Sequence, residues 1–156
     1  MGETLGKKAE DKIRDWLNKP ELGYSFDRIP DQMNGQYGSK NICDFTCYKF
    51  PYMYYIESKS TYEDRFDFSM ITDYQYENLL SKSQIAGVRS YVIVLFATYQ
   101  QAFILNIQTI DTIIKSGKKS INIKKKLKWE FPYYEIPTIP SRKQLLDYTG
   151  DLPEEV

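Results

Sequence analysis

Three charged residues lie in an otherwise apolar and aromatic stretch, residues 42–61, which is typical of two strands joined by a turn. Asp44 falls on the first predicted strand, and Glu57 and Lys59 fall two positions apart on the second. Because side chains alternate between the two faces of a strand, Glu57 and Lys59 are expected on the same face. Charged groups in an apolar strand are costly unless they are paired or bind a metal, so this spacing predicts a functional site.

These residue types suit the hydrolysis of a phosphodiester bond. Asp44 and Glu57 can hold a hard divalent cation such as Mg²⁺, with the main-chain carbonyl of Ser58 as a third ligand. A bound cation would polarise a phosphoryl oxygen and lower the pKa of a water molecule. Lys59 would orient that water or stabilise charge on the phosphate. The alternative is an ordinary hairpin with a Glu–Lys pair on its surface.

The composition is that of one globular domain covering residues 1–156. This length allows a sizeable core, and 42% hydrophobic with 15% aromatic residues exclude a disordered chain. The formal net charge is zero, yet residues 115–128 carry seven lysines and no acidic residue. Such uneven charge predicts a basic face on a neutral protein.

The two cysteines, Cys43 and Cys47, are expected on one strand face about 13 Å apart, too far for a disulfide. The chain has no histidine, so a zinc site is unsupported, and both cysteines are expected to be core thiols of a reducing compartment. No signal peptide is visible, and the apolar run at residues 91–98 is too short to span a bilayer. We therefore expect a cytoplasmic location and no membrane partner.

The remaining pattern predicts an α/β fold with a mixed central sheet flanked by helices. Apolar residues at helical spacing, with caps and stops, predict four helices, at residues 4–18, 72–82, 107–115 and 143–148. Apolar or alternating runs predict the strands around the central hairpin, at residues 24–29, 90–97, 102–107 and 136–140, with a short extended piece at 66–70. Residues 120–128 also alternate, and the Gly-rich residues 30–41 are expected to form a loop.

The order of these elements carries a resemblance. An N-terminal helix followed by Asp44 and Glu57-x-Lys59 on adjacent strands resembles the PD-(D/E)xK signature of the restriction-endonuclease-like fold. Ile-Glu-Ser-Lys-Ser-Thr at residues 56–61 resembles Phe-Glu-Ala-Lys-Glu-Thr of the RecU family of Holliday-junction resolvases. Tyr-Gln-Tyr-Glu-Asn-Leu at residues 74–79 is similar to that family's His-Gln-Ile-Glu-His-Leu. Further landmarks follow in the same order, so the resemblance covers nearly the whole chain.

The resemblance implies a Mg²⁺-dependent endonuclease, with Mn²⁺ able to substitute, that cuts four-way DNA junctions in recombination and repair. Asp44 and Glu57 would bind the metal, and Lys59 would stabilise the transition state. Gln75 would face the metal from its helix, directly or through water. Such an enzyme would be a bacterial or phage-encoded homodimer, since two cuts across a two-fold junction need two active sites.

Glu10 is the fifth candidate for the catalytic site. Gly6 and Glu10 match the Gly-x-x-x-Glu that opens the first helix in resolvases of this fold, so Glu10 would support the site from that helix. Without the resemblance, Glu10 is read as a solvated helix charge. The lysine run is either a solvated surface or a phosphate-binding face, and the candidates for DNA binding are Lys40, Lys118, Lys119, Lys124 and Lys125.

Two features depart from the family pattern. Ile42 stands where RecU proteins usually have Thr, so any ligand role at that position is lost. The short loop at residues 30–41 stands where they carry a long stalk that inserts at the junction centre. Three alternatives therefore stay open: another nuclease of the fold, restriction-type or DNA-repair, acting on duplex or branched DNA; a catalytically idle DNA-binding relative; and a plain interaction protein.

Overall fold

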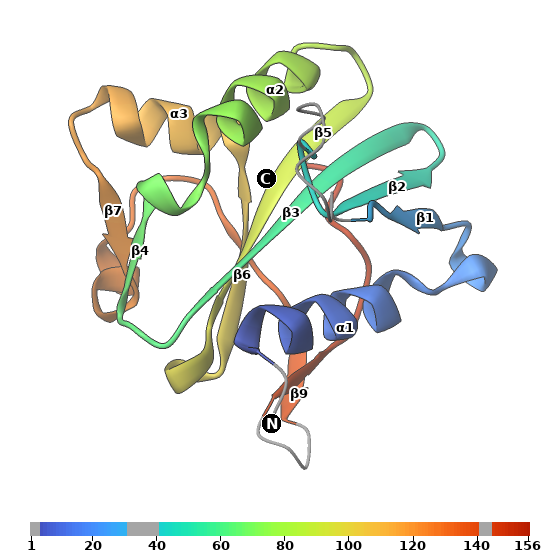
Figure 1. The fold of residues 1–156 in the computed structure, drawn as a ribbon, viewed down its shortest axis with the longest axis horizontal. Coiled ribbons are helices and arrows are strands. Elements are labelled where there is room, and N and C mark those ends of the chain that lie inside the picture. The colour runs from blue at the N-terminus through green and yellow to red at the C-terminus, as the bar shows by residue number, and fades with distance from the viewer. Residues whose placement is uncertain (1–3, 31–40, 141–144) are drawn as a thin grey trace.

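A mixed sheet of six strands forms the centre of the computed structural model, which describes residues 4–30, 41–140 and 145–156 (Figure 1). The strand order is β1-β2-β3-β5-β6-β8, with bounds Ser25–Arg28, Phe45–Lys49, Tyr52–Thr61, Val88–Phe96, Gln101–Asn106 and Tyr134–Glu135. All neighbours are antiparallel except β3 and β5. The helix-flanked mixed sheet predicted from the sequence is confirmed.

Helices cover both faces of this sheet. The first helix, α1 (Leu5–Leu17), packs on one face, while α2 (Asp73–Ser83) and α3 (Ile107–Lys115) pack on the other (Figure 1). Along β3 and β5 the side chains alternate between the two cores: Tyr54 and Ile56 face α1, whereas Val92 and Val94 face α2 and α3. None of the described helices is long and apolar enough to cross a membrane.

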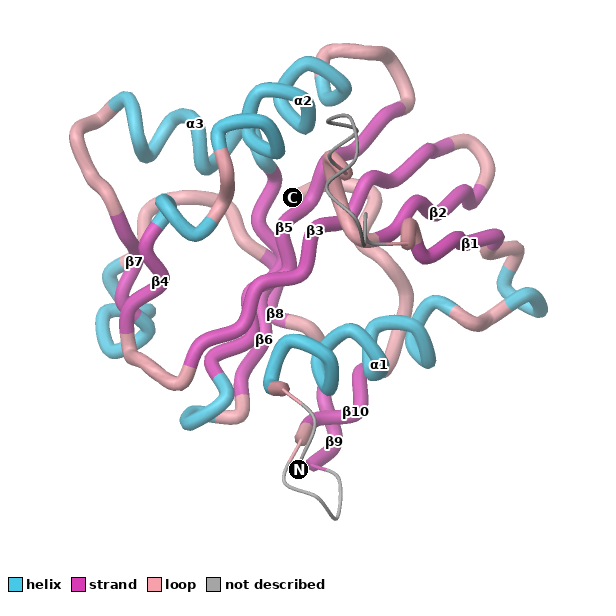
Figure 2. Tube along the Cα trace, viewed as in Figure 1, coloured by secondary structure: helices cyan, strands magenta, loops and turns pink. Residues whose placement is uncertain are grey.

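Two small sheets complete the described chain. β4 (Arg65–Asp67) pairs with β7 (Ser120–Asn122), and β9 (Thr138–Pro140) pairs with β10 (Leu146–Tyr148), which lies beneath α1 (Figure 2). Short 3-10 turns lie between these elements, at Pro20–Leu22 (η1), Phe68–Met70 (η3), Ala97–Tyr99 (η4) and Ile123–Lys128 (η5).

The two halves of β3 have different neighbours, and this difference creates the candidate site. Residues 52–56 pair with β2 on one side, whereas residues 53–61 pair with β5 on the other. Within the described part of the chain, no strand pairs with the β2-side edge of residues 57–61. Glu57 and Lys59 therefore lie where the sheet forks and the edge of β3 becomes accessible.

Two expectations about the end of the chain are wrong. A helix was expected at residues 143–148, of which 143 and 144 lie outside the described residues. Residues 146–148 form strand β10 instead, because Leu146 and Tyr148 are buried on one side and Tyr148 packs edge-on against Trp16 at 5.9 Å. The alternation at residues 120–128 holds only through β7, after which the backbone turns into η5.

The cysteines are buried and free, as expected for core thiols, but they do not share a face. Cys43 belongs to the core under α2 and α3, and Cys47 belongs to the core under α1. The expectation of one face is wrong because Cys43 precedes β2, so the strand alternation does not extend to it. Burial raises the pKa of both thiols to about 12, which keeps them protonated and unreactive.

Candidate active site

Asp44 lies one residue before β2, not on it as the sequence predicts. Its main-chain N–H donates to Ile56 O at 3.1 Å and its carbonyl accepts from Ile29 N at 2.8 Å. Its carboxylate Oδ2 accepts from Ser58 N at 2.9 Å. In a regular sheet, Ser58 N–H of β3 would donate to a main-chain carbonyl of β2. Here it donates to the Asp44 side chain instead, so the regular pairing of β2 stops there and the carboxylate is fixed beside β3.

Glu57 is the buried centre of the site, with 2% of its surface exposed. Its Oε2 accepts from Lys59 Nζ at 2.9 Å and from Gln75 Nε2 at 3.0 Å. Its Oε1 is buried and has no hydrogen-bond donor among the described residues, while the Asp44 carboxyl group lies close enough to share a proton with Glu57. A buried carboxylate oxygen without a partner is costly, so this atom points to a missing ligand.

Lys59 is fixed between two partners, and its side chain is only 16% exposed. Besides the bond to Glu57, its Nζ donates to Gln75 Oε1 at 3.3 Å. These contacts exclude the alternative of a Glu–Lys pair on the surface of a hairpin. Glu57 and Lys59 share a face of β3, as their spacing predicts.

Gln75 connects the site to the start of α2. Thr72 and Gln75 form a capping box, in which Thr72 Oγ1 accepts from Gln75 N at 3.1 Å and Gln75 Oε1 accepts from Thr72 N at 3.2 Å. The same amide contacts Glu57 and Lys59. A capping geometry that fixes the helix start therefore also fixes the amide against the carboxylate and the ammonium.

Replacing Gln75 with Ala is expected to lower cleavage by about tenfold or more, because outer-shell partners typically contribute 10- to 100-fold. The variant also loses half of the capping box, a cost of about 1 kcal/mol. Thr72→Ala is the matched control: it removes the Thr72 side-chain cap but leaves both contacts of the Gln75 amide to the site. Steady-state cleavage rates and melting temperatures of the two variants separate the role of Gln75 in the active site from its role in capping α2. Equal cleavage rates in both variants would show that Gln75 only caps the helix.

Arg28 is the site residue that the sequence analysis missed. Its guanidinium donates to Glu10 Oε2 at 2.8 and 3.2 Å, and its Nη2 is 3.9 Å from Asp44 Oδ1. Its CZ lies 5.6 Å from the centroid of the Phe45 ring. Glu10 therefore contacts the site through Arg28, and its supporting role from α1 stays a prediction. The sequence shows only an arginine in a short predicted strand, and this pattern alone does not predict a role in the site.

Electrostatics disfavour two negative charges at this place. Burial, and next the charge of Glu57, raise the pKa of Asp44 from 3.8 to about 7, against the opposing effects of Ser58 N–H and Arg28. Burial also raises the pKa of Glu57, although Lys59 and Gln75 oppose the shift. Two adjacent carboxyl groups with raised pKa values are expected where a cation or a shared proton completes the charge balance.

The residues present fit a divalent cation of the magnesium type. Among the described residues no cluster of three or more His, Cys, Asp or Glu side chains occurs, so the site offers the two carboxylates alone. Mg²⁺ is commonly bound through one or two carboxylates, with water and substrate phosphates filling the remaining positions. The partnerless Oε1 of Glu57 is the atom that such an ion would satisfy.

The predicted DNA-binding lysines divide into two groups. Lys124 pairs with Asp64 at 3.4 Å, whereas Lys118, Lys119 and Lys125 are exposed and form no ion pair with a described residue. Lys40 lies outside the described residues. Only the second group is free to contact phosphate.

The chain is similar to a protein family and to a solved structure. A family model described as recombination protein U matches residues 24–149. Among solved structures, the chain is similar to Hjc, a Holliday junction resolvase from Archaeoglobus fulgidus, with 17% identity over 67% of this chain and 78% of that chain and a TM-score of 0.48. No curated protein matches the sequence significantly.

Proposed function

The chain belongs to the RecU family of Holliday-junction resolvases, and on this basis we propose how its own residues carry out the cleavage. As a resolvase it is a DNA endonuclease that acts on branched DNA. The proposal concerns the metal, the roles of the site residues and the assembly. The observation that carries it is the buried Glu57 Oε1 without a partner, next to Asp44 and Lys59.

Asp44 and Glu57 would hold one Mg²⁺, or Mn²⁺ in its place, with the main-chain carbonyl of Ser58 as a further ligand. When bound, the ion polarises the scissile phosphate and lowers the pKa of a water molecule. Ser58 N–H keeps the Asp44 carboxylate in place. Gln75 keeps the Glu57 carboxylate in place by donating to Oε2, which leaves Oε1 for the ion.

Lys59 would act on the reacting phosphate. Its ammonium is held between Glu57 and Gln75, so it can orient the attacking water or stabilise charge that develops on the phosphate oxygens. Arg28 neutralises part of the negative charge at Asp44. The accessible edge of β3 lets a DNA backbone approach these groups without displacing a strand.

The loop at residues 30–41 starts and ends beside the site. Asn41 Nδ2 donates to Pro30 O at 2.5 Å, and Ile29 N donates to Asp44 O at 2.8 Å. The two ends of the loop are therefore held together next to Asp44. Residues 31–40, including Lys40, lie outside the described residues; as the counterpart of the family's stalk, the loop would contribute to junction selectivity in a single nuclease domain.

A homodimer would place two such sites across the two-fold axis of a junction. The test is a cleavage assay on four-way junction, linear duplex and flap DNA with Mg²⁺, in parallel with sedimentation. We expect a dimer that cuts the junction in paired strands, and an excess of Asp44→Asn protein mixed with wild type should convert paired cuts into single nicks. Equal cutting of linear duplex would favour another nuclease of this fold, and paired cuts from a monomer would contradict the dimer.

A further inference from the structure

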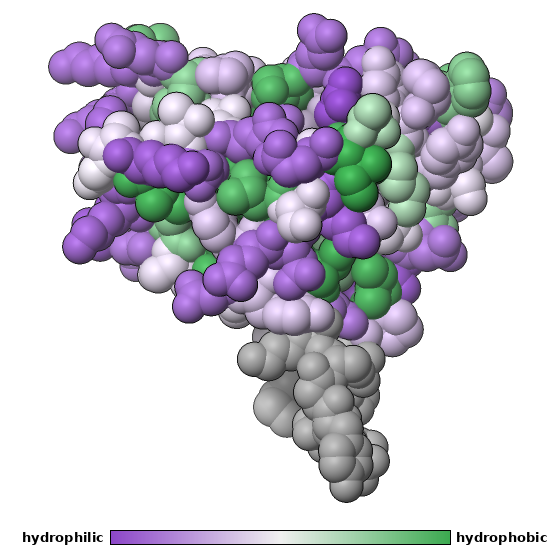
Figure 3. All heavy atoms as spheres, turned by 90° about the horizontal axis from the view of Figure 1, so that it is seen from above, coloured by the Kyte–Doolittle hydropathy of each residue, from purple (hydrophilic) through white to green (hydrophobic). Residues whose placement is uncertain are grey.

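Beyond the catalytic site, a cavity of about 410 Å³ lies between β4, β7 and η5, and it is lined by cations and aromatic rings. Four basic side chains and two aromatic ones border it: Arg65, Lys118, Lys125, Lys128, Trp129 and Phe131. Its volume falls within the range of about 300–1,000 Å³ that is typical of ligand sites. β4 and β7 lie at the left of Figure 1, and the left side of the surface in Figure 3 is largely hydrophilic.

Three lysines at this cavity form no ion pair within the described ranges, although nearby lysines do, and Arg65 lies near Asp67, whose pKa its charge helps to lower. Lys124 pairs with Asp64 at 3.4 Å and Lys126 pairs with Glu135 at 3.3 Å. Arg65, Lys118, Lys125 and Lys128 form no ion pair with any described carboxylate. Because like charges repel, four cations around one cavity whose lining contains no acidic residue suit an anionic ligand with several charges.

The aromatic wall is held by several contacts. Trp129 and Phe131 are stacked, with centroids 5.2 Å apart and planes at 28°. Trp129 Nε1 donates to Asn122 O at 3.2 Å, and its ring packs edge-on against Phe103 and Tyr133. A fixed aromatic wall beside phosphate-binding cations is the combination that binds unpaired nucleotides by stacking and charge.

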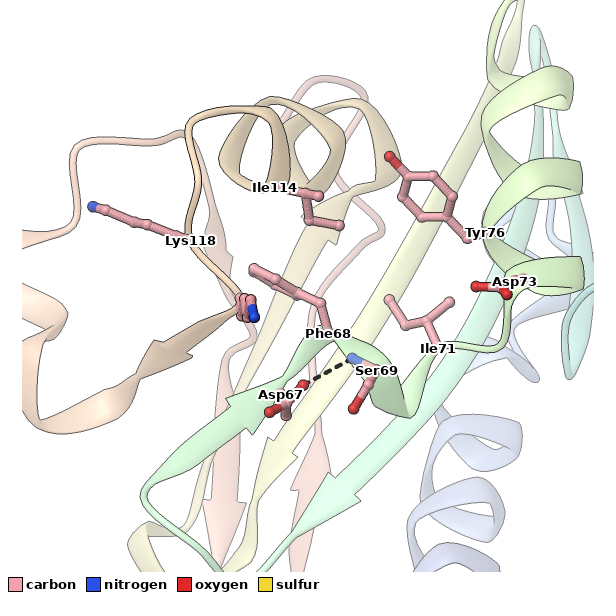
Figure 4. A pocket seen from close by; sticks show the side chains of 9 residues that line it. Asp67, Phe68, Ser69, Ile71, Asp73, Tyr76, Ile114 and Lys118 are labelled. Atoms are coloured by element: carbon pink, nitrogen blue, oxygen red, sulfur yellow. Dashed lines mark hydrogen bonds between the residues drawn. The ribbon is translucent and has the colours of Figure 1, made fainter.

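The neighbouring pocket between η3, α2 and α3 is a useful contrast. Figure 4 shows Phe68, Ile71 and Ile114 at its wall, with Asp67 and Asp73 near its rim. Acidic and basic side chains both border that pocket, so it does not select an anion. The cavity at Trp129, in contrast, is bordered by cations and stacked rings, and its lining contains no acidic residue.

We propose that the cavity at Trp129 binds unpaired nucleotides of a DNA strand, with phosphates on Arg65, Lys118, Lys125 and Lys128 and a base against the Trp129–Phe131 wall. The proposal depends on the proposed function in one respect: that function identifies the bound strand as part of a branched DNA substrate. Eight residues separate Glu57 from Arg65, a span of at most about 29 Å. A strand with about 3.4 Å per nucleotide could reach both places with roughly eight nucleotides.

The test is the binding of a short oligothymidylate in EDTA, followed by tryptophan fluorescence and anisotropy. Trp16 is buried with 1% exposure, so quenching reports Trp129. Lys125→Ala with Lys128→Ala is expected to weaken binding by about tenfold and to reduce the salt slope by about 1.4, since each single-strand phosphate contact contributes about 0.7. Trp129→Phe should retain most of the affinity by anisotropy but lose the quenching.

Lys124→Ala with Lys126→Ala is the matched control, because it changes the net charge equally and reduces long-range attraction to the same extent. We expect it to bind within about twofold of wild type. Three results would each overturn the proposal. The first is an equal loss of affinity in both double variants, and the second is quenching by an abasic oligomer as strong as with thymidylate. The third is binding of blunt duplex as strong as that of the oligothymidylate. No cleavage is measured, so failure here is distinct from failure of the nuclease assignment.

Discussion

Asp44→Asn and Glu57→Gln are each expected to lower junction cleavage by about 10³-fold or more, because the charge stabilisation that a metal ion supplies is worth several kcal/mol. Both substitutions keep the size and one acceptor oxygen of the side chain, so Ser58 N–H and Gln75 can still donate to them. Junction binding in the absence of metal should persist, since the phosphate contacts that we propose for the lysines would supply it. Rates and binding isotherms of both variants check this, with Asp147→Asn, a half-exposed carboxylate of β10 that pairs with Lys12 of α1, as the control.

Asp44→Asn is expected to lower the cleavage rate but to raise the stability of the metal-free protein. The pKa of Asp44 is raised in the folded protein to about 7, so the stability that this group contributes is fully present below its unfolded pKa near 4. It is lost as the pH rises through about 7. In EDTA above pH 7, Asp44→Asn should therefore melt at a higher temperature than wild type.

Magnesium should reverse this order. The ion is expected to raise the melting temperature of wild type above pH 7 and to leave that of Asp44→Asn unchanged, since only the former retains both carboxylates. A variant that melts below wild type in EDTA at this pH, and that gains equally from magnesium, would show that Asp44 is a structural residue instead.

Lys59→Ala is expected to lower the cleavage rate by about 10²-fold or more, the usual cost of removing one preorganised electrostatic group. The effect should fall on the turnover rate, with little change in junction affinity, because the ammonium is enclosed by Glu57 and Gln75 and is little exposed. Single-turnover kinetics measure this directly. Lys7→Ala, which removes an exposed lysine of α1, is the control and should cleave as wild type does.

Lys59→Arg adds a second comparison. The charge is retained, but the larger planar group does not fit the contacts of an ammonium between Glu57 and Gln75. We expect it to recover only part of the lost rate. Turnover near the wild-type value in Lys59→Ala would mean that charge at this position does not stabilise the transition state.

Local pattern was sufficient to predict the sheet and the pair on β3. The period of two places Glu57 and Lys59 on one face whatever the rest of the chain does, and the β-branched run of β5 predicts its burial. The capping signal at Thr72 also predicts where α2 begins. These features depend on residues that are neighbours in the sequence, so they can be predicted from a single sequence.

Long-range contacts could not be predicted in this way. Arg28 reaches Asp44 only because β1 pairs with β2. Gln75 reaches Glu57 only because α2 packs over β5, the strand that pairs with β3. The expected C-terminal helix failed for the same reason, since β10 is determined by its pairing with β9 and by contacts with α1. The position of Asp44 just before β2 likewise depends on its side-chain bond to Ser58 N.

The central claim is that Asp44 and Glu57 together hold one divalent cation at the fork of β3. Calorimetric titration of Mn²⁺ and Mg²⁺ into wild type, Asp44→Asn and Glu57→Gln tests it most directly. The account predicts one site in wild type that is lost, or strongly weakened, in each variant. Undiminished binding of both ions by both variants would contradict it.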